Sequence, residues 1–134
     1  MTDVGLFSNR FFVNTQALRK FDESVRFFRI KRPLAEVKTN RDKVQNLLRV
    51  LQPIRDGLNG KLSESMVIDD QGVVKILRDR HSLKWQSYCA QINDITARLE
   101  AEKIELSRDD LVLLNDIADA LDSHCATLFR RIRG

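Results

Sequence analysis

Apolar residues recur at helical spacing along most of this chain, while turn-forming residues are scarce. Only five Gly and two Pro occur among 134 residues, which leaves little material for the tight turns of an all-β fold. Apolar side chains at intervals of three and four share one face of a helix and can be buried together. We therefore predict an all-α fold, with residues 1–134 forming a single helical-bundle domain of four to five helices.

The first helix is expected to begin at Asn14 or Thr15, because either side chain can cap the first free N–H groups. It should end near Arg32, since Pro33 disfavours the α conformation in the residue before it. The apolar stripe that would face the core of the bundle consists of Leu18, Phe21, Val25 and Phe28.

Three further helices are predicted from the same spacing. The second begins between Pro33 and Asn40 and carries an apolar stripe from Val37 to Leu58, and Pro53 inside it is expected to kink or end the helix. The third covers about residues 79–106, and the fourth begins at Ser107 and runs antiparallel to the third. The core predicted for these last two helices contains Trp85, Cys89, Ile92, Leu99, Leu114, Leu121, Cys125 and Leu128.

Residues 63–76 have a different character. Two short β-prone runs, residues 65–68 and 73–76, flank the turn sequence Asp69-Asp70-Gln71-Gly72. We expect a small β-hairpin inserted here, packed on the helices because a lone hairpin is marginally stable. The alternative is an irregular loop.

The sequence carries no catalytic or cofactor signature. The potential metal ligands His81, Cys89, His124 and Cys125 show neither C-x-x-C nor H-x-x-x-H spacing. No Gly-rich phosphate loop is present, and no nucleophile has a base at a suitable spacing. We predict no metal, no cofactor, no small-molecule substrate and no enzymatic activity.

The two cysteines and the lack of targeting segments bear on the compartment. Cys89 and Cys125 are interpreted as two buried free thiols, with a disulfide as the alternative. No apolar stretch reaches the ~20 residues of a membrane span, and no secretory signal follows Met1. We expect a cytoplasmic protein.

Charge is divided between two segments. Residues 10–32 carry seven Lys or Arg and two acids, a net of +5, whereas residues 94–122 carry three Lys or Arg and nine acids, a net of −6. The net charge of the whole chain is only +4. These segments are either solvated helix faces or complementary surfaces, which could pair within the bundle or between copies of the chain.

The basic N-terminal helix contains the candidate binding residues Arg19, Lys20, Arg26, Phe27 and Ile30. Phe27 and Ile30 lie off the core stripe, beside the three cations. An exposed apolar patch with Arg and aromatic residues is typical of a binding hot spot. The alternative is that Phe27 and Ile30 are buried under the N-terminal arm.

These observations favour a non-enzymatic binding or assembly subunit. We expect it to dock a protein partner, or to form a homo-oligomer, through the basic and aromatic N-terminal helix. The alternative is a nucleic-acid-binding helical protein in which the same cations contact phosphates. Binding through phosphates weakens steeply as salt is raised, so salt dependence separates the two hypotheses.

Overall fold

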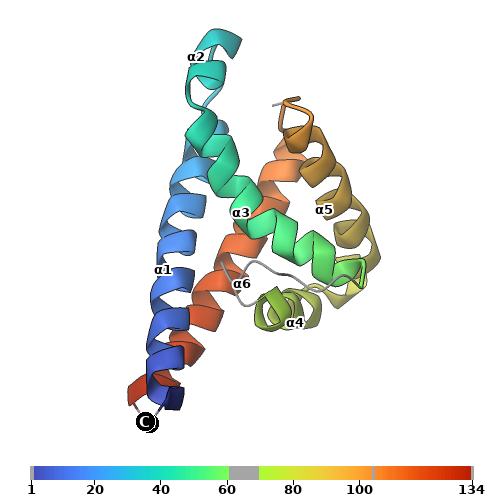
Figure 1. The fold of residues 1–134 in the computed structure, drawn as a ribbon. Helices are drawn as coiled ribbons and strands as arrows, with labels where there is room; N and C mark the ends of the chain where they lie inside the picture. The colour runs from blue at the N-terminus through green and yellow to red at the C-terminus, as the bar shows by residue number, and fades with distance from the viewer. Residues whose placement is uncertain (1, 61–69, 104, 134) are drawn as a thin grey trace.

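The part of the chain that the structure describes is mostly helical, as the sequence predicts. The structure is a computed structural model, and it describes residues 2–60, 70–103 and 105–133 (Figure 1). No β-strand occurs among these residues. The elements are α1 (Thr2–Arg29), α2 (Leu34–Thr39), α3 (Arg41–Leu58), α4 (Asp70–Arg80), the 3₁₀ helix η1 (Ser82–Lys84), α5 (Trp85–Glu100) and α6 (Arg108–Arg133).

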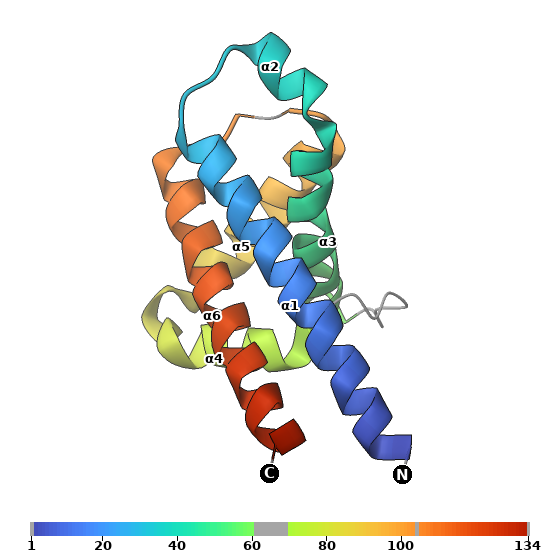
Figure 2. The same cartoon turned by 90° about the vertical axis from the view of Figure 1, so that its left-hand side faces the viewer.

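The long helices α1, α3 and α6 form the centre of the bundle. α1 runs antiparallel to both α3 and α6 and packs along them (Figures 1 and 2). α5 packs on α3, while α4 lies across the bundle and contacts α3 and α6. Figure 2 looks onto a side where no other described helix covers the α1–α6 pair, and there both chain ends project past α4.

The core forms where the apolar stripes of these helices meet. Burial of each apolar side chain removes its surface from water, and this is the main favourable term in folding. Phe21 and Val25 of the predicted α1 stripe are buried, and Leu18 and Phe28 pack against the core from its edge. The largest fully buried side chains are Phe21, Leu47, Leu51, Ile54, Leu77, Ile92, Ile95, Leu99, Leu113, Leu114, Ile117 and Leu121.

The predicted hairpin is not seen. The run 65–68 lies outside the described residues, while residues 73–76, expected as a strand, lie within α4. Val73 and Leu77, one helical turn apart, are both fully buried on one face of α4. Gly72 was interpreted as the end of a turn, but it lies in the helix against the His124 ring. A Cβ at position 72 would lie 2.4 Å from Cε1 of that ring.

The single helix predicted for residues 79–106 is wrong at both ends. The chain turns at His81, whose backbone leaves the helical conformation at φ −126° and ψ 44°, so Asp79 belongs to α4 and α5 begins only at Trp85. α5 then ends at Glu100. Glu102 follows at a φ of 60°, in the left-handed region, and Lys103 donates its backbone N–H to Arg98 O at 2.8 Å. This backbone arrangement is a Schellman motif, in which the reversed turn satisfies the last carbonyls of the helix.

The predicted bounds of α1 are also wrong. The helix begins at Thr2, so Asn14 and Thr15 lie inside it, and it ends at Arg29 instead of Arg32. A capping side chain permits a helix to start but does not force it to, so the signal was misleading. Arg32 donates from Nε to the carbonyl of Phe27 at 3.2 Å, which satisfies a backbone acceptor in the last turn.

Pro53 does not end α3, which continues to Leu58. Two predicted core residues are also only half-buried: Trp85, at the first position of α5, and Cys89. The other predicted core residues of α5, Ile92 and Leu99, are buried as expected. α5 and α6 run in opposite directions, as expected, but α6 packs mainly on α1 and α4 and touches α5 little (Figure 1).

Candidate functional site

Phe27, the aromatic member of the predicted binding set, lies in the last turn of α1. The Arg32 guanidinium carbon lies 4.3 Å from the centre of the Phe27 ring, and the Phe28 ring meets it edge-on at 5.3 Å. Arg32 also forms an ion pair with Glu36 at 2.7 Å. The Arg32 guanidinium therefore covers one face of the Phe27 ring, and it is held there by the Phe27 carbonyl and by Glu36. Phe27 is half-buried and helps to fix the turn between α1 and α2.

The other apolar member, Ile30, is 61% exposed, so burial of this residue under the N-terminal arm is not what the structure shows. Arg19, Lys20 and Arg26 are exposed as well. Arg26 forms an ion pair with Asp22 at 3.0 Å, one helical turn earlier, and its side chain remains 73% exposed. Such exposed pairs stabilise a helix little, so Arg26 stays available for a partner.

A groove that the sequence did not reveal runs between α1 and α6. It encloses about 380 Å³ and is lined by Thr15, Leu18, Arg19, Asp22, Ala118, Asp119 and Asp122. Leu18 and Ala118 supply apolar surface, and the charged side chains stand around them. Arg19 thus joins three acids at the α1–α6 seam. Finding this groove required knowing which helix packs beside α1; the sequence signal was the acidic excess of residues 94–122.

Four of the nine acids in that stretch are paired or hydrogen-bonded within the fold. Asp94 and Asp110 both pair with Arg98, and Glu100 pairs with Arg55. Asp116 accepts a hydrogen bond from the Tyr88 hydroxyl. Asp119 and Asp122, by contrast, are exposed and form no ion pair with any described residue.

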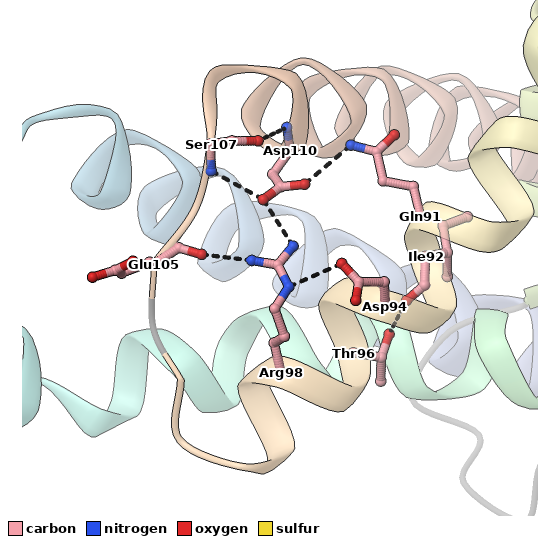
Figure 3. Close-up of polar contacts among 8 residues, drawn as sticks. All are labelled: Gln91, Ile92, Asp94, Thr96, Arg98, Glu105, Ser107 and Asp110. Carbon is pink, nitrogen blue, oxygen red and sulfur yellow. Dashed lines mark hydrogen bonds and ion pairs between the residues drawn. The ribbon is translucent and has the colours of Figure 1, made fainter.

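The most connected polar cluster ties the end of α5 to the start of α6 (Figure 3). Ser107 and Asp110 cap α6 reciprocally: Asp110 N–H donates to Ser107 Oγ at 3.1 Å, and Ser107 N–H donates to Asp110 Oδ2 at 3.0 Å. The cap predicted at Ser107 is therefore confirmed. Arg98 donates from Nη2 to the same carboxylate oxygen at 2.9 Å, and Gln91 donates to the other at 3.1 Å.

The electrostatics of Asp110 follow from these bonds. Its burial alone would raise the pKa of the carboxyl group, but the bonds from Ser107, Arg98 and Gln91 outweigh that effect and hold the pKa below its usual value. Asp110 therefore stays ionised in a buried position. The cluster fixes the joint between α5 and α6.

A second polar group lies where α4, α5 and α6 meet. Tyr88 donates its hydroxyl hydrogen to Asp116 Oδ2, and His81 Nε2 lies 3.7 Å from the same oxygen. Burial, together with the hydrogen bond to Asp116, raises the pKa of Tyr88 to about 12. The tyrosine thus remains protonated and acts as a donor that holds Asp116 in place.

Both cysteines are free thiols, so the disulfide alternative is not what the structure shows. Burial raises the pKa of the Cys89 thiol, and it raises the pKa of Cys125 to about 11. Since the thiolate is the reactive form, both groups are weak nucleophiles near neutral pH.

Residues 2–60, 70–103 and 105–133 contain no candidate metal site and no candidate membrane-spanning helix. No group of three or more His, Cys, Asp or Glu side chains is placed to hold a metal ion there. None of the helices in this part of the chain combines the length and apolar character that crossing a bilayer requires.

No protein-family model, curated protein or solved structure matches this chain.

Proposed function

We propose that this protein is a non-enzymatic assembly subunit that docks a protein partner, or another copy of itself, through the exposed face of α1. The observation that carries the proposal is Ile30, a large apolar side chain that is 61% exposed directly after α1, whose last turn contains Arg26 and Arg29. A lone exposed apolar residue needs no explanation, but Ile30 does not stand alone.

A second exposed apolar side chain supports the same surface. Arg29 donates from Nη2 to Asn115 Oδ1 at 3.0 Å, which places the end of α1 beside the first turns of α6. Val112, one turn before Asn115 on α6, is 46% exposed. Ile30 and Val112 therefore lie at the same end of the α1–α6 seam, with Arg26 close by. Apolar anchors beside Arg are the composition of protein-binding hot spots.

The nucleic-acid alternative is supported by the exposed cations of the same helix, Arg19, Lys20 and Arg26. The acids on the seam count against it, since Asp119 and Asp122 on α6 would repel a phosphate backbone that lay along α1. A protein surface with charges of both signs suits this seam better than a uniformly negative strand.

The test compares Ile30→Asp with a matched control, Leu83→Asp. Leu83 is 102% exposed on η1, away from the seam, so its replacement makes the same chemical change outside the proposed surface. Light scattering after size exclusion would measure self-association, and capture of a purified partner would measure hetero-association. Ile30→Asp should weaken either one by about 2 kcal/mol, and Leu83→Asp should change neither.

Addition of a random-sequence duplex oligonucleotide separates the alternative. If the protein binds the duplex with a steep salt dependence and Ile30→Asp has no effect, the nucleic-acid function is correct and the docking proposal is wrong.

A further inference from the structure

The charges along the α1–α6 seam are arranged so that two copies of the chain complement each other. On α1, Arg19 and Arg26 are exposed; on α6, Asp119 and Asp122 are exposed. Arg19, Asp119 and Asp122 have no ion-pair partner among the described residues of their own chain. α1 and α6 lie side by side, and no other described helix covers them in the view of Figure 2. Asp22, also on the α1 side of the groove, is paired with Arg26, so the α1 side carries a net positive charge and the α6 side a net negative one.

Closed homodimers form about a two-fold axis, and each possible axis makes a different prediction. If the axis runs perpendicular to the helices, α1 meets α1 of the second copy and like charges face each other. If it runs along the seam, α1 of each copy lies on α6 of the other, and opposite charges meet. Electrostatic complementarity therefore selects the axis along the seam.

The same axis brings the residues to matching levels. Arg19, Asp119 and Asp122 line one groove, so they lie at one level along the seam of a single chain. A rotation about an axis parallel to the seam keeps each residue at its level. The second copy's α1 therefore presents its basic residue at position 19 opposite Asp119 and Asp122. By the same rule, Ile30 of one copy comes to the level of Val112 on the other, because Arg29 is bonded to Asn115.

The size of the surface is sufficient for a stable dimer. α1 contains 28 residues and α6 contains 26, so each is about 40 Å long at about 1.5 Å per residue. Two helices about 10 Å wide cover roughly 800 Å² per copy, which is the area of a standard specific interface.

We infer that the uncovered α1–α6 face is a two-fold self-association surface, in which α1 of each copy lies antiparallel against α6 of the other. The occupant of the groove is thus a second copy of this chain. This inference rests on the proposed docking role of α1 and names its partner.

The experiment uses two charge-reversed variants of the full chain. The first is Arg19→Glu with Arg26→Glu, which makes both sides of the seam acidic; the second is Asp119→Lys with Asp122→Lys, which makes both basic. In each variant alone, α1 and the facing α6 of the second copy carry like charges and should repel. In a dimer of one copy of each variant, an acidic α1 faces a basic α6 at one contact, and a basic α1 faces an acidic α6 at the other. A control, Lys38→Glu with Arg41→Glu, makes the same charge change on exposed residues of α2 and α3.

Sedimentation at about 100 μM chain would detect even a weak dimer of this size. The wild type and the control should sediment at twice the 15.5 kDa chain mass. Each charge-reversed variant should dissociate at least about tenfold more readily, and an equimolar mixture of the two should restore the dimer. Restoration also shows that both variants are folded.

The inference and the underlying docking proposal fail in distinguishable ways. A wild type that remains monomeric at this concentration overturns the inference. The inference is also overturned if Ile30→Asp dissociates the dimer but the two charge-reversed variants do not recombine. In that case docking through α1 still stands. If Ile30→Asp leaves the dimer intact and the mixture does not recombine, both are overturned.

Discussion

Gly72 offers a sharp test of how α4 packs on α6. In a helix, Gly→Ala normally stabilises by up to about 1 kcal/mol, because Ala loses less conformational entropy and has the higher helix propensity. At position 72 the new Cβ would lie 2.4 Å from Cε1 and 2.6 Å from Nδ1 of His124. His124 is itself buried, at 6% exposure, so its ring cannot turn out into solvent.

The expected magnitude follows from these opposing effects. Overpacking of a closed site costs about 1–3 kcal/mol, and the helix-propensity gain recovers at most about 1 kcal/mol. Gly72→Ala should therefore destabilise the protein by about 1–2 kcal/mol, or lower Tm by roughly 3–8 °C at this chain length. A change of the opposite sign would place Gly72 away from His124.

A double-mutant cycle isolates the contact between the two residues. In a His124→Ala background the ring is gone, and Gly72→Ala should then be neutral or stabilising. Urea unfolding monitored by circular dichroism would give the four free energies, and the coupling energy should be about 1–3 kcal/mol. A coupling near zero would refute the packing of α4 against α6 described above.

Three further predictions address other contacts. Asp110→Asn should lower stability at pH 7 by about 1.5–3 kcal/mol. The folded pKa of Asp110 lies below its ordinary value of 3.8, so the difference in stability between wild type and variant should be fully present above pH 3.8. The difference should shrink when urea unfolding is repeated at pH values that fall through the folded pKa. Glu102→Gly should raise stability by about 0.5–1 kcal/mol in thermal melts, since Glu102 occupies the left-handed conformation at φ 60° that Gly adopts freely, and a loss of stability would contradict the Schellman assignment. Leu121→Ala should cost about 2–5 kcal/mol in urea unfolding because Leu121 is fully buried, and a loss below about 1 kcal/mol would mean that the face of α6 is assigned wrongly.

The sequence predicted those features that depend on near neighbours in the chain. The stripe through Phe21 and Val25 identified the buried face of α1, because a three- and four-residue spacing needs no knowledge of the partner helix. Ser107 was recognised as a cap because its partner, Asp110, lies only three residues away. Arg98, which completes that cluster from α5, could not be assigned since its position depends on the chain reversal between the two helices.

The errors occurred where tertiary contacts override local preference. Val73 has a high β propensity, yet it lies in α4 because Val73 and Leu77 together fill the core. Gly72 resembled a turn residue, whereas its small size accommodates His124 from a helix 52 residues further along the chain. At His81 the backbone leaves the helical conformation, so α4 ends at Arg80 and α5 begins at Trp85. Apolar spacing alone had predicted one continuous helix across this point.

The binding surface was predictable only in part. The basic helix and its exposed Ile30 could be identified from residue spacing, but Phe27 could not be placed, because its contact with Arg32 depends on how the chain turns at Pro33. The groove beside Asp119 required the packing of α1 on α6, which pairs residues about 100 positions apart in the sequence.

The most direct test of self-association along the α1–α6 seam is an isotope-mixed crosslinking measurement. Arg19→Lys keeps the charge and supplies an amine that a zero-length carbodiimide can couple to a neighbouring carboxylate. The variant would be prepared in ¹⁴N and ¹⁵N forms, mixed, equilibrated, crosslinked and analysed by mass spectrometry. We expect crosslinked peptides that join position 19 to Asp119 or Asp122 and contain one light and one heavy partner. If every such crosslink carries a single isotope, α1 meets α6 only within one chain, and the proposed dimer is contradicted.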